Sequence, residues 1–377
     1  MAKAKTARVA DVVGLLNKLC SPLLAEDWDN VGLQVGDHTA PVTKVLICLD
    51  AEEPALREAE KIGAQLIISH HPVIFRPLKR VSPSDATGRI LFSAIKNNIA
   101  IASAHTNLDR AADGLNDWLA DALQLTAVTP LEAPATDGFV KLVVYVPLGY
   151  EQAVMEELFA AGAGQIGAYD RCSFRVLGTG TFRGNDSSHP VIGQPGRQEA
   201  VEELRLETLV AKPLLAKVLQ GMRKAHPYEE VAYDVIPLAN PDQQVGLGRI
   251  GRLPMPLSLG AFAAQVKEAL QADALRLVGD PEAQLEKIAV CGGSGMAVFA
   301  DAQRQGADCL VTGDVKFHDA QRARAEGVAL IDAGHFATER LMIGGLSRRL
   351  RRLCEESQFD IEIIEMTAEQ DPFVAVF

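Results

Sequence analysis

Three short segments of this 377-residue chain carry histidines, and two of the three also carry an acidic side chain. The segments contain His70 and His71, His105 with Asp109, and His335 with Glu339. Imidazole nitrogens and carboxylate oxygens are common protein ligands of zinc, manganese and iron. If a helix begins near His335, Glu339 lies one turn later on the same face, so that both side chains point the same way. These residue types therefore predict a metal site.

Each segment follows an apolar run that is typical of a buried strand, at residues 65–69, 99–101 and 328–331. Gly334 allows the chain to turn sharply between the last of these strands and the helix that follows it. In an open α/β sheet, ligands bind at the carboxyl ends of the strands. We therefore expect the three segments to meet at such an edge.

Adjacent histidines favour two metal ions over one. Neighbouring residues of a strand project to opposite sides, so His70 and His71 more easily serve two ions, and Glu339 is placed to bridge them. Two divalent ions about 3.5–4 Å apart form a hydrolytic site. The mixed ligand set suits zinc, manganese or iron and does not select among them. The alternative is a structural histidine pair in which one ring is hydrogen-bonded to a carbonyl oxygen.

Several other residues have both a site role and a structural role as open interpretations. His105 is a candidate for a residue that orients a ligand, for a general acid or base, and for a hydrogen-bonded loop residue. Residues 26–36 form either a packed turn around Trp28 or a loop at the mouth of the site. Asp314 and His318 either begin a helix or join the site.

Three basic or glycine-rich features are weaker candidates for anion contacts. The turn at residues 292–295 resembles a phosphate-binding turn at a helix N-terminus but lacks the full motif spacing. Lys79 and Arg80 are further candidates for phosphate contacts. The arginines between residues 348 and 352 are more simply the solvated face of the last long helix.

The order of expected elements indicates two domains. Strands and helices alternate in residues 1–127 and again in residues 246–377, which predicts one discontinuous, two-lobed α/β domain with mostly parallel sheets. Residues 126–137 read as a linker. The intervening residues, 128–245, follow the order strand, helix, two strands, helix, strand, which predicts an inserted ferredoxin-like α+β domain.

The composition narrows the class of protein. The formal net charge of −12 disfavours binding to nucleic acid. No apolar run of about 18 residues is present, so no membrane span is expected, and the cytoplasm is the expected compartment. The six cysteines are scattered without a Cys-x-x-Cys pair, which argues against a disulfide framework and a zinc ribbon.

Taken together, the motifs resemble those of the Nif-three-like dinuclear metal-centre family, whose members are called GTP cyclohydrolase 1 type 2 homologues. The motifs that carry the resemblance span nearly the whole chain. They are Trp28-Asp29-Asn30-Val31-Gly32-Leu33, His70-His71-Pro72, His105-Thr106-Asn107-Leu108-Asp109, Thr312-Gly313-Asp314, and Gly334-His335 followed by Thr338-Glu339. Residues 139–238 resemble the insert of the longer members, which is similar to PII and CutA trimers.

The resemblance implies a set of ligands and an assembly. It implies that His71 and Asp109 hold one metal ion, that His70 and His335 hold a second ion, and that Glu339 touches both. It also implies a ring-shaped homohexamer whose metal sites face an internal cavity.

Two functions from different classes are compatible with these features, and the sequence leaves open whether the chain is an enzyme. The first is metal-dependent hydrolysis of a nucleotide-like or other small heterocyclic substrate, such as ring opening of GTP, with His105 moving a proton. The second is a non-catalytic role in metal handling, or as a scaffold that binds a partner through the insert.

Overall fold

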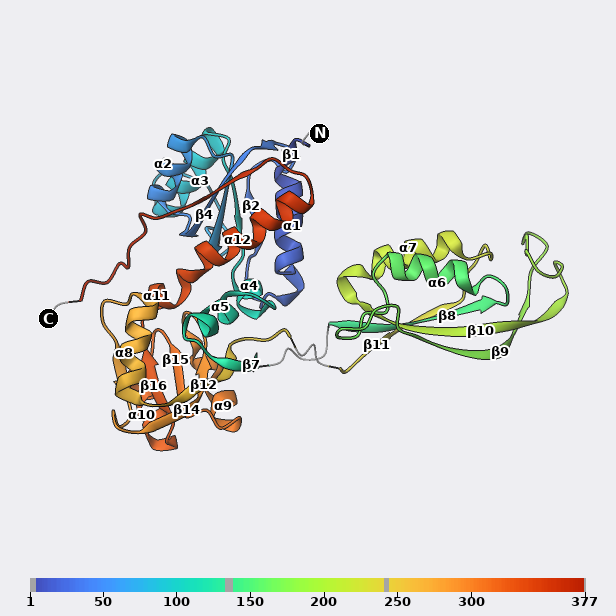
Figure 1. The fold of residues 1–377 in the computed structure, drawn as a ribbon. Helices are drawn as coiled ribbons and strands as arrows, with labels where there is room; N and C mark the ends of the chain where they lie inside the picture. The colour runs from blue at the N-terminus through green and yellow to red at the C-terminus, as the bar shows by residue number, and fades with distance from the viewer. Residues whose placement is uncertain (1–4, 133–137, 241–243, 376–377) are drawn as a thin grey trace. The chain divides into compact units, whose positions relative to one another are not determined.

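The computed structural model describes residues 5–132, 138–240 and 244–375 (Figure 1). The chain divides into two compact units, Met1–Ala133 with Gln243–Phe377, and Pro134–Asp242. We call them unit 1 and unit 2 and describe each by itself. Unit 1 contains two lobes, each built around one sheet.

The first lobe contains a five-stranded sheet in the order β17-β4-β5-β6-β2. Strand β4 pairs in parallel with β17 and β5, and β5 pairs in parallel with β6, whereas β2 is antiparallel to β6. The strands are β2 (Gly32–Val35), β4 (Lys44–Asp50), β5 (Leu66–His71), β6 (Ala100–Ser103) and β17 (Glu362–Glu365). A separate pair is formed by β1 (Ala7–Arg8) and β3 (Pro41–Val42).

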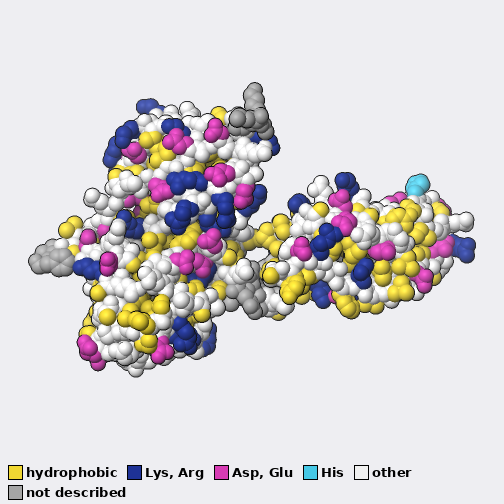
Figure 2. All heavy atoms as spheres, viewed as in Figure 1, with side chains coloured by type: hydrophobic (Ala, Val, Ile, Leu, Met, Phe, Trp, Pro, Cys, Tyr) yellow, Lys and Arg dark blue, Asp and Glu magenta, His cyan; other side chains and the backbone are white. Residues whose placement is uncertain are grey.

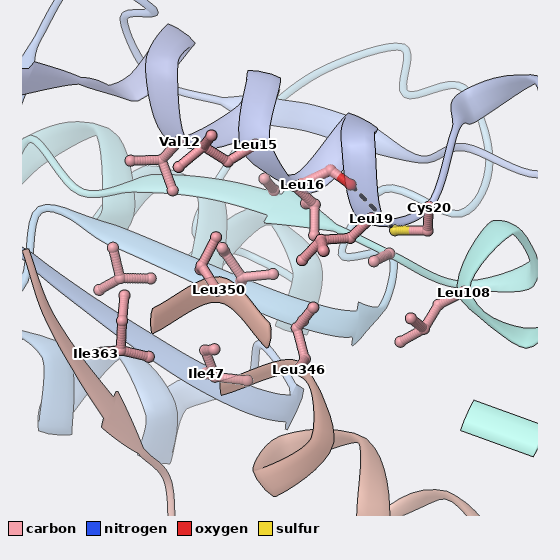
Figure 3. Close-up of a cluster of buried hydrophobic side chains, with 14 of the residues drawn as sticks. Val12, Leu15, Leu16, Leu19, Cys20, Ile47, Leu108, Leu346, Leu350 and Ile363 are labelled. Atoms are coloured by element: carbon pink, nitrogen blue, oxygen red, sulfur yellow. Dashed lines mark hydrogen bonds between the residues drawn. The ribbon is translucent and has the colours of Figure 1, made fainter. Parts of the chain in front are cut away.

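Helices cover both faces of this sheet because successive side chains of its strands alternate between the faces. Ile47 and Leu49 of β4 belong to a buried cluster with helices α1 and α12 (Figure 3). Leu46 and Cys48 belong to a second cluster, with helices α2 and α3. The helices of this lobe are α1 (Val9–Leu19), η1 (Pro22–Leu24), α2 (Glu53–Ile62), α3 (Ala86–Lys96), α4 (Thr106–Arg110) and α12 (Leu341–Glu356).

The second lobe contains a six-stranded sheet in the order β13-β16-β15-β14-β12-β7. Its strands are β7 (Thr126–Pro130), β12 (Arg249–Ser258), β13 (Arg276–Val278), β14 (Gln284–Val290), β15 (Cys309–Thr312) and β16 (Ala329–Asp332). Its helices are α5 (Leu115–Ala122), α8 (Leu259–Leu270), η3 (Gly295–Val298), α9 (Phe299–Arg304), α10 (Phe317–Glu326) and α11 (His335–Glu339).

The pairing in this sheet differs from the mostly parallel arrangement that we predicted. The pairs β14–β15 and β15–β16 are parallel, but β12 is antiparallel to both β7 and β14, and β13 is antiparallel to β16. The predicted linker also begins too early, because residues 126–130 form a strand that pairs with β12. Residues 133–137 of that linker lie outside the described residues.

Unit 2 is an antiparallel sheet in the order β11-β8-β10-β9, with two helices. Buried side chains of α6 and α7 form its core together with those of β8 and β10. Strand β9 is exposed along most of its length. Its elements are β8 (Phe139–Pro147), α6 (Glu151–Ala160), β9 (Ser173–Arg183), β10 (Gln198–Ala211), η2 (Lys212–Leu214), α7 (Leu215–Ala225) and β11 (Tyr233–Pro237).

The surface of α12 carries the expected basic face. Figure 2 shows Lys and Arg side chains gathered over this helix. Most of these arginines have acidic partners, because Arg349 pairs with Asp113 at 3.1 Å and Arg351 pairs with Glu365 at 2.9 Å. Across the part of the chain that the structure describes, no helix combines the length and the apolar character that a membrane span requires.

Candidate metal centre

The structure brings together the five residues predicted as metal ligands, between the two lobes of unit 1. His70 and His71 end strand β5, Asp109 lies in α4, and His335 and Glu339 begin and end α11. The Nε2 atom of His70 lies 3.6 Å from Asp109 Oδ1 and 3.7 Å from Glu339 Oε1. The Nε2 atoms of His71 and His335 both lie 3.0 Å from Glu339 Oε2. The carboxylate of Glu339 therefore faces two separate groups of ligands.

The grouping differs from the one that the family resemblance implies. The short distances join His70 with Asp109, whereas His71 and His335 approach each other to 3.3 Å between their Nε2 atoms. The resemblance implies the pairs His71 with Asp109 and His70 with His335. In this structure each oxygen of Glu339 serves one group, His70–Asp109 or His71–His335.

A hydrogen bond at Nδ1 fixes the orientation of each of the four histidine rings. Each Nδ1 atom lies within hydrogen-bonding distance of an oxygen acceptor, so Nδ1 carries the hydrogen and the Nε2 lone pair is free for a metal ion. The four Nδ1 contacts are His70 to Ala104 O (2.8 Å), His71 to Asp50 Oδ1 (2.8 Å), His105 to Asp29 Oδ1 (2.9 Å) and His335 to Asp314 Oδ2 (2.7 Å). The expected carbonyl contact of the histidine pair is therefore present, and it leaves Nε2 of His70 available.

Two buried atoms of the centre, His70 Nε2 and Asp109 Oδ1, have no hydrogen-bond partner among the described residues. A buried polar atom without a partner is costly, and more so when it belongs to a charged group. Both atoms carry lone pairs and lie 3.6 Å apart, and a divalent cation between them would satisfy both. The groups His71, His335 and Glu339, and His70, His71 and His105, each have the spacing to hold an ion.

The pKa values of the centre show strong coupling between the charges. Burial raises the pKa of Asp109 to about 7, although nearby His70 opposes this shift. Burial acts to lower the pKa of His71, but its contacts with Asp50 and Glu339 raise it to about 10. The contact with Glu339 raises the pKa of His335 to about 9. Without a metal ion, protons on His71 and His335 therefore supply the positive charge that Glu339 requires.

Two glycines make room for α11. Gly334 begins the turn into the helix with a φ of +86°. Gly293 has a φ of +59°, and a Cβ atom there would collide with Glu339 Oε1. The turn at residues 292–295 is therefore part of the wall of the metal centre.

The backbone of this turn is not available as a phosphate cradle, so that interpretation of the sequence is wrong. The Gly293 N–H donates to Thr338 Oγ1 at 3.0 Å, and the Gly295 N–H donates to Thr312 Oγ1 at 2.8 Å. The Gly292 N–H donates to Asn116 Oδ1 at 2.9 Å.

The structure decides which of the neighbouring residues contact the site. Asp314 joins the site by holding His335, whereas His318 is hydrogen-bonded to Gln321 on the surface of α10. The loop of residues 26–36 lies against His105, since the ring of Trp28 meets that of His105 edge-on at 6.0 Å. His105 itself lies beside the rings of His70 and His71.

The sequence interpretation named Asp314 as a candidate but gave no role to the other two acidic residues that hold histidines, Asp29 and Asp50. Asp50 ends β4 and lies directly opposite His71 in the strand register, which is the signal that an alignment of the two strands would give. Asp29 accepts hydrogen bonds from Thr106 N and Thr106 Oγ1 in addition to its contact with His105. Burial opposes these contacts, yet they lower the pKa of Asp29 to about 2, so it remains a carboxylate that orients His105.

Comparisons with known proteins agree with the motifs. The Duf34/NIF3 (NGG1p interacting factor 3) family matches residues 7–372. The Halalkalibacterium halodurans protein named GTP cyclohydrolase 1 type 2 homolog is 42% identical over 372 residues, which cover 99% of this chain and 100% of the relative. The Bacillus subtilis protein of the same name is 40% identical over 370 residues, which cover 98% of this chain and 99% of the relative.

A solved structure extends the similarity to the whole fold. The crystal structure of a Bacillus cereus protein related to NIF3 matches with a TM-score of 0.90 at 40% sequence identity, and the match covers 99% of this chain and 100% of that chain. The chain belongs to the Duf34/NIF3 family.

Proposed function

We propose that unit 1 holds two divalent metal ions. The chemistry of the ligands suits zinc, manganese or iron. His70, Asp109 and one oxygen of Glu339 hold the first ion. His71, His335 and the other oxygen of Glu339 hold the second. The unpartnered buried atoms His70 Nε2 and Asp109 Oδ1, beside the carboxylate of Glu339, are the observation that carries this proposal.

We further propose that the centre hydrolyses a nucleotide-like or other small heterocyclic substrate. GTP is the first substrate to test, because the relatives are named GTP cyclohydrolase 1 type 2 homolog. Bound divalent ions supply Lewis acidity to such a reaction. The ring of His105 is held by Asp29 at Nδ1 and adjoins the rings of His70 and His71, so its Nε2 atom is placed to move a proton.

The test combines metal analysis with turnover. Purified full-length protein is loaded with zinc, manganese or iron, and formate release from GTP is measured for each form. Activity is expected to disappear in Glu339→Ala together with the bound metal. Glu268→Gln, at an exposed position of α8, is the matched control and should keep both. Two bound ions without turnover of GTP or of a panel of other nucleotides would contradict the hydrolase proposal and favour metal handling.

The proposal for the insert has its own support. We propose that unit 2, Pro134–Asp242, forms a ferredoxin-like domain of the PII/CutA kind, because the order β8-α6-β9-β10-α7-β11 and the antiparallel pairing follow that pattern. The predicted boundary at residue 128 is wrong, since residues 126–130 pair with β12 in unit 1. The exposed Phe174 and Leu177 of β9 favour the alternative role of the insert as a contact surface. We also propose a homohexamer and a cytoplasmic location. Light scattering on the full chain tests the assembly.

A further inference from the structure

We infer that the entrance of the metal centre binds a planar heterocycle that carries a phosphate group, by stacking on Trp28 and Phe75 and by pairing with Arg76, Lys79 and Arg80. This inference rests on the proposed function and specifies the substrate class of the same site. We call these five residues the entrance cluster.

The first observation is a pair of exposed aromatic rings, Trp28 and Phe75, next to His105 of the metal centre. The side chains of Trp28 and Phe75 are 57% and 49% exposed, and their ring centroids lie 5.7 Å apart at an interplanar angle of 55°. Large aromatic side chains usually gain stability by burial, so two adjacent exposed rings leave a surface free for a ligand. Trp28 also contacts His105, whose ring lies 5.1 Å from that of His70. A base stacked on Trp28 therefore lies beside the metal ligands.

The second observation is that the two loops are held together. The side-chain amide of Asn30 donates to Ile74 O at 2.6 Å, and Ile74 N donates to Gln34 Oε1 at 2.9 Å. Gln34 also donates to Ser103 Oγ at the end of β6, at 2.9 Å. These bonds fix the loop of Trp28 to the loop of Phe75 and both to the sheet. A preformed stacking surface loses less conformational entropy when the ligand binds.

The third observation is local positive charge without a partner. Residues 72–84 contain Arg76, Lys79 and Arg80 and no acidic residue, although the whole chain has a formal net charge of −12. The three side chains are exposed, and no ion pair joins any of them to another described residue. The arginines of α12 differ, since Arg349 and Arg351 have acidic partners. Guanidinium and ammonium groups bind phosphate through charge-assisted hydrogen bonds.

The distribution of the two tryptophans makes this inference directly testable. Trp118 is only 7% exposed, and its Nε1 donates to Asp113 Oδ1 at 3.0 Å. Ligand-induced quenching of tryptophan fluorescence therefore reports on Trp28. Full-length protein with metal bound is titrated with GTP, guanosine and inorganic triphosphate, and binding is measured in parallel by equilibrium dialysis.

The expected results distinguish binding of the heterocyclic ring from binding of the phosphate group. GTP and guanosine quench the fluorescence, whereas triphosphate binds without quenching. Trp28→Ala weakens GTP binding roughly fivefold or more, since stacking on one aromatic side chain has at least this effect. The triple variant Arg76→Gln/Lys79→Gln/Arg80→Gln weakens binding of GTP but not of guanosine, and makes GTP binding less dependent on salt.

Matched controls exclude a general effect of charge or folding. Lys96→Gln/Lys217→Gln/Arg324→Gln removes three other exposed cations, none of which has an ion pair with a described residue, and should bind GTP like the wild type. Thermal unfolding of each variant identifies misfolded protein, and Trp28→Phe keeps an aromatic ring while it removes the reporter.

The outcomes for the entrance cluster and for catalysis are distinct. Unchanged GTP binding in folded Trp28→Ala and in the triple variant overturns the entrance cluster even if metal-loaded protein releases formate. Quenching by GTP that depends on the cluster, without any formate release, supports the cluster and contradicts the hydrolase proposal.

Discussion

The two halves of the candidate metal centre share Glu339 but differ in their access to solvent. In the His70–Asp109 half, the side chains are 0% and 13% exposed, and the unpartnered atoms His70 Nε2 and Asp109 Oδ1 lie there. In the His71–His335 half, the exposed fractions are 25% and 38%. If the centre binds two ions as proposed, this difference predicts that the buried half retains its ion, whereas the more exposed half exchanges its ion or presents it to a ligand.

The largest expected effect comes from the residue that both halves share. Glu339→Gln removes the negative charge between the two groups of ligands, and we expect the metal content to fall from about two ions per chain to almost none. Elemental analysis after gel filtration measures this. If Glu339→Gln retained one ion, the carboxylate would belong to a single half.

The two halves should respond differently when one histidine is removed. In metal-free protein, His70→Ala leaves the buried carboxylate of Asp109 without its neighbour and should lower the free energy of unfolding by roughly 1–3 kcal/mol. His335→Ala acts on a more exposed group and should change it by less than about 1 kcal/mol. Urea unfolding of both variants decides this, and equal losses would remove the distinction between the halves.

The stability of the metal-free protein should depend on pH in two ranges, one for each half of the centre. The pKa of Asp109 is raised to about 7 from 3.8, so its contribution to stability is full below pH 3.8 and is lost as the pH rises to about 7. The pKa of His71 is raised from 6.5 to about 10, so its contribution is full below pH 6.5 and is lost as the pH rises to about 10.

Unfolding free energies measured between pH 4 and pH 10 test these two ranges. Asp109→Asn should abolish the pH dependence of stability between pH 3.8 and about 7 and leave the dependence between pH 6.5 and about 10. Metal-loaded protein should show little of the dependence between pH 6.5 and about 10, because the ion replaces the protons on the histidines. An Asp109→Asn profile that matches the wild type would contradict the assignment.

The smallest effect is expected from a residue that holds a histidine without touching the metal. Asp50→Asn keeps the shape of the side chain but weakens the contact with His71 Nδ1 at 2.8 Å. We expect the affinity of the His71–His335 half to fall roughly 10- to 100-fold, with the other half unchanged. Competition with a metal chelator measures both affinities. Asp37→Asn, at an exposed loop position, is the control.

The ligands were predictable because they follow apolar strands in the sequence. His70 and His335 each stand directly after such a run or its turn, and the rule for the carboxyl ends of strands places them together. The acidic residues that orient the histidine rings were harder to predict from the sequence. Asp50 reaches His71 through the register of two strands. Asp314 holds His335 from a left-handed backbone conformation of its own, with a φ of +55°, which the local sequence pattern does not reveal.

The strand pairing of the six-stranded sheet could not be predicted from the sequence in the same way. Alternating strands and helices favour parallel pairs, but β12 and β7 pair across the insert, which separates them in the sequence by more than a hundred residues. The turn at residues 292–295 was misread for a related reason. Its glycines serve close contact with Glu339 and α11, and a sequence pattern does not distinguish that use from anion binding.

Helix α11 supplies ligands from the second lobe, and α12 follows it after Arg340 and packs into the hydrophobic cluster of the first lobe. An ion shared by His71 and His335 would therefore tie strand β5 of one sheet to a helix that follows the other. Its arrival should set the spacing of the two lobes, and its removal should let that spacing fluctuate. A pair of fluorescent labels, one on each lobe, would then read metal occupancy as a distance.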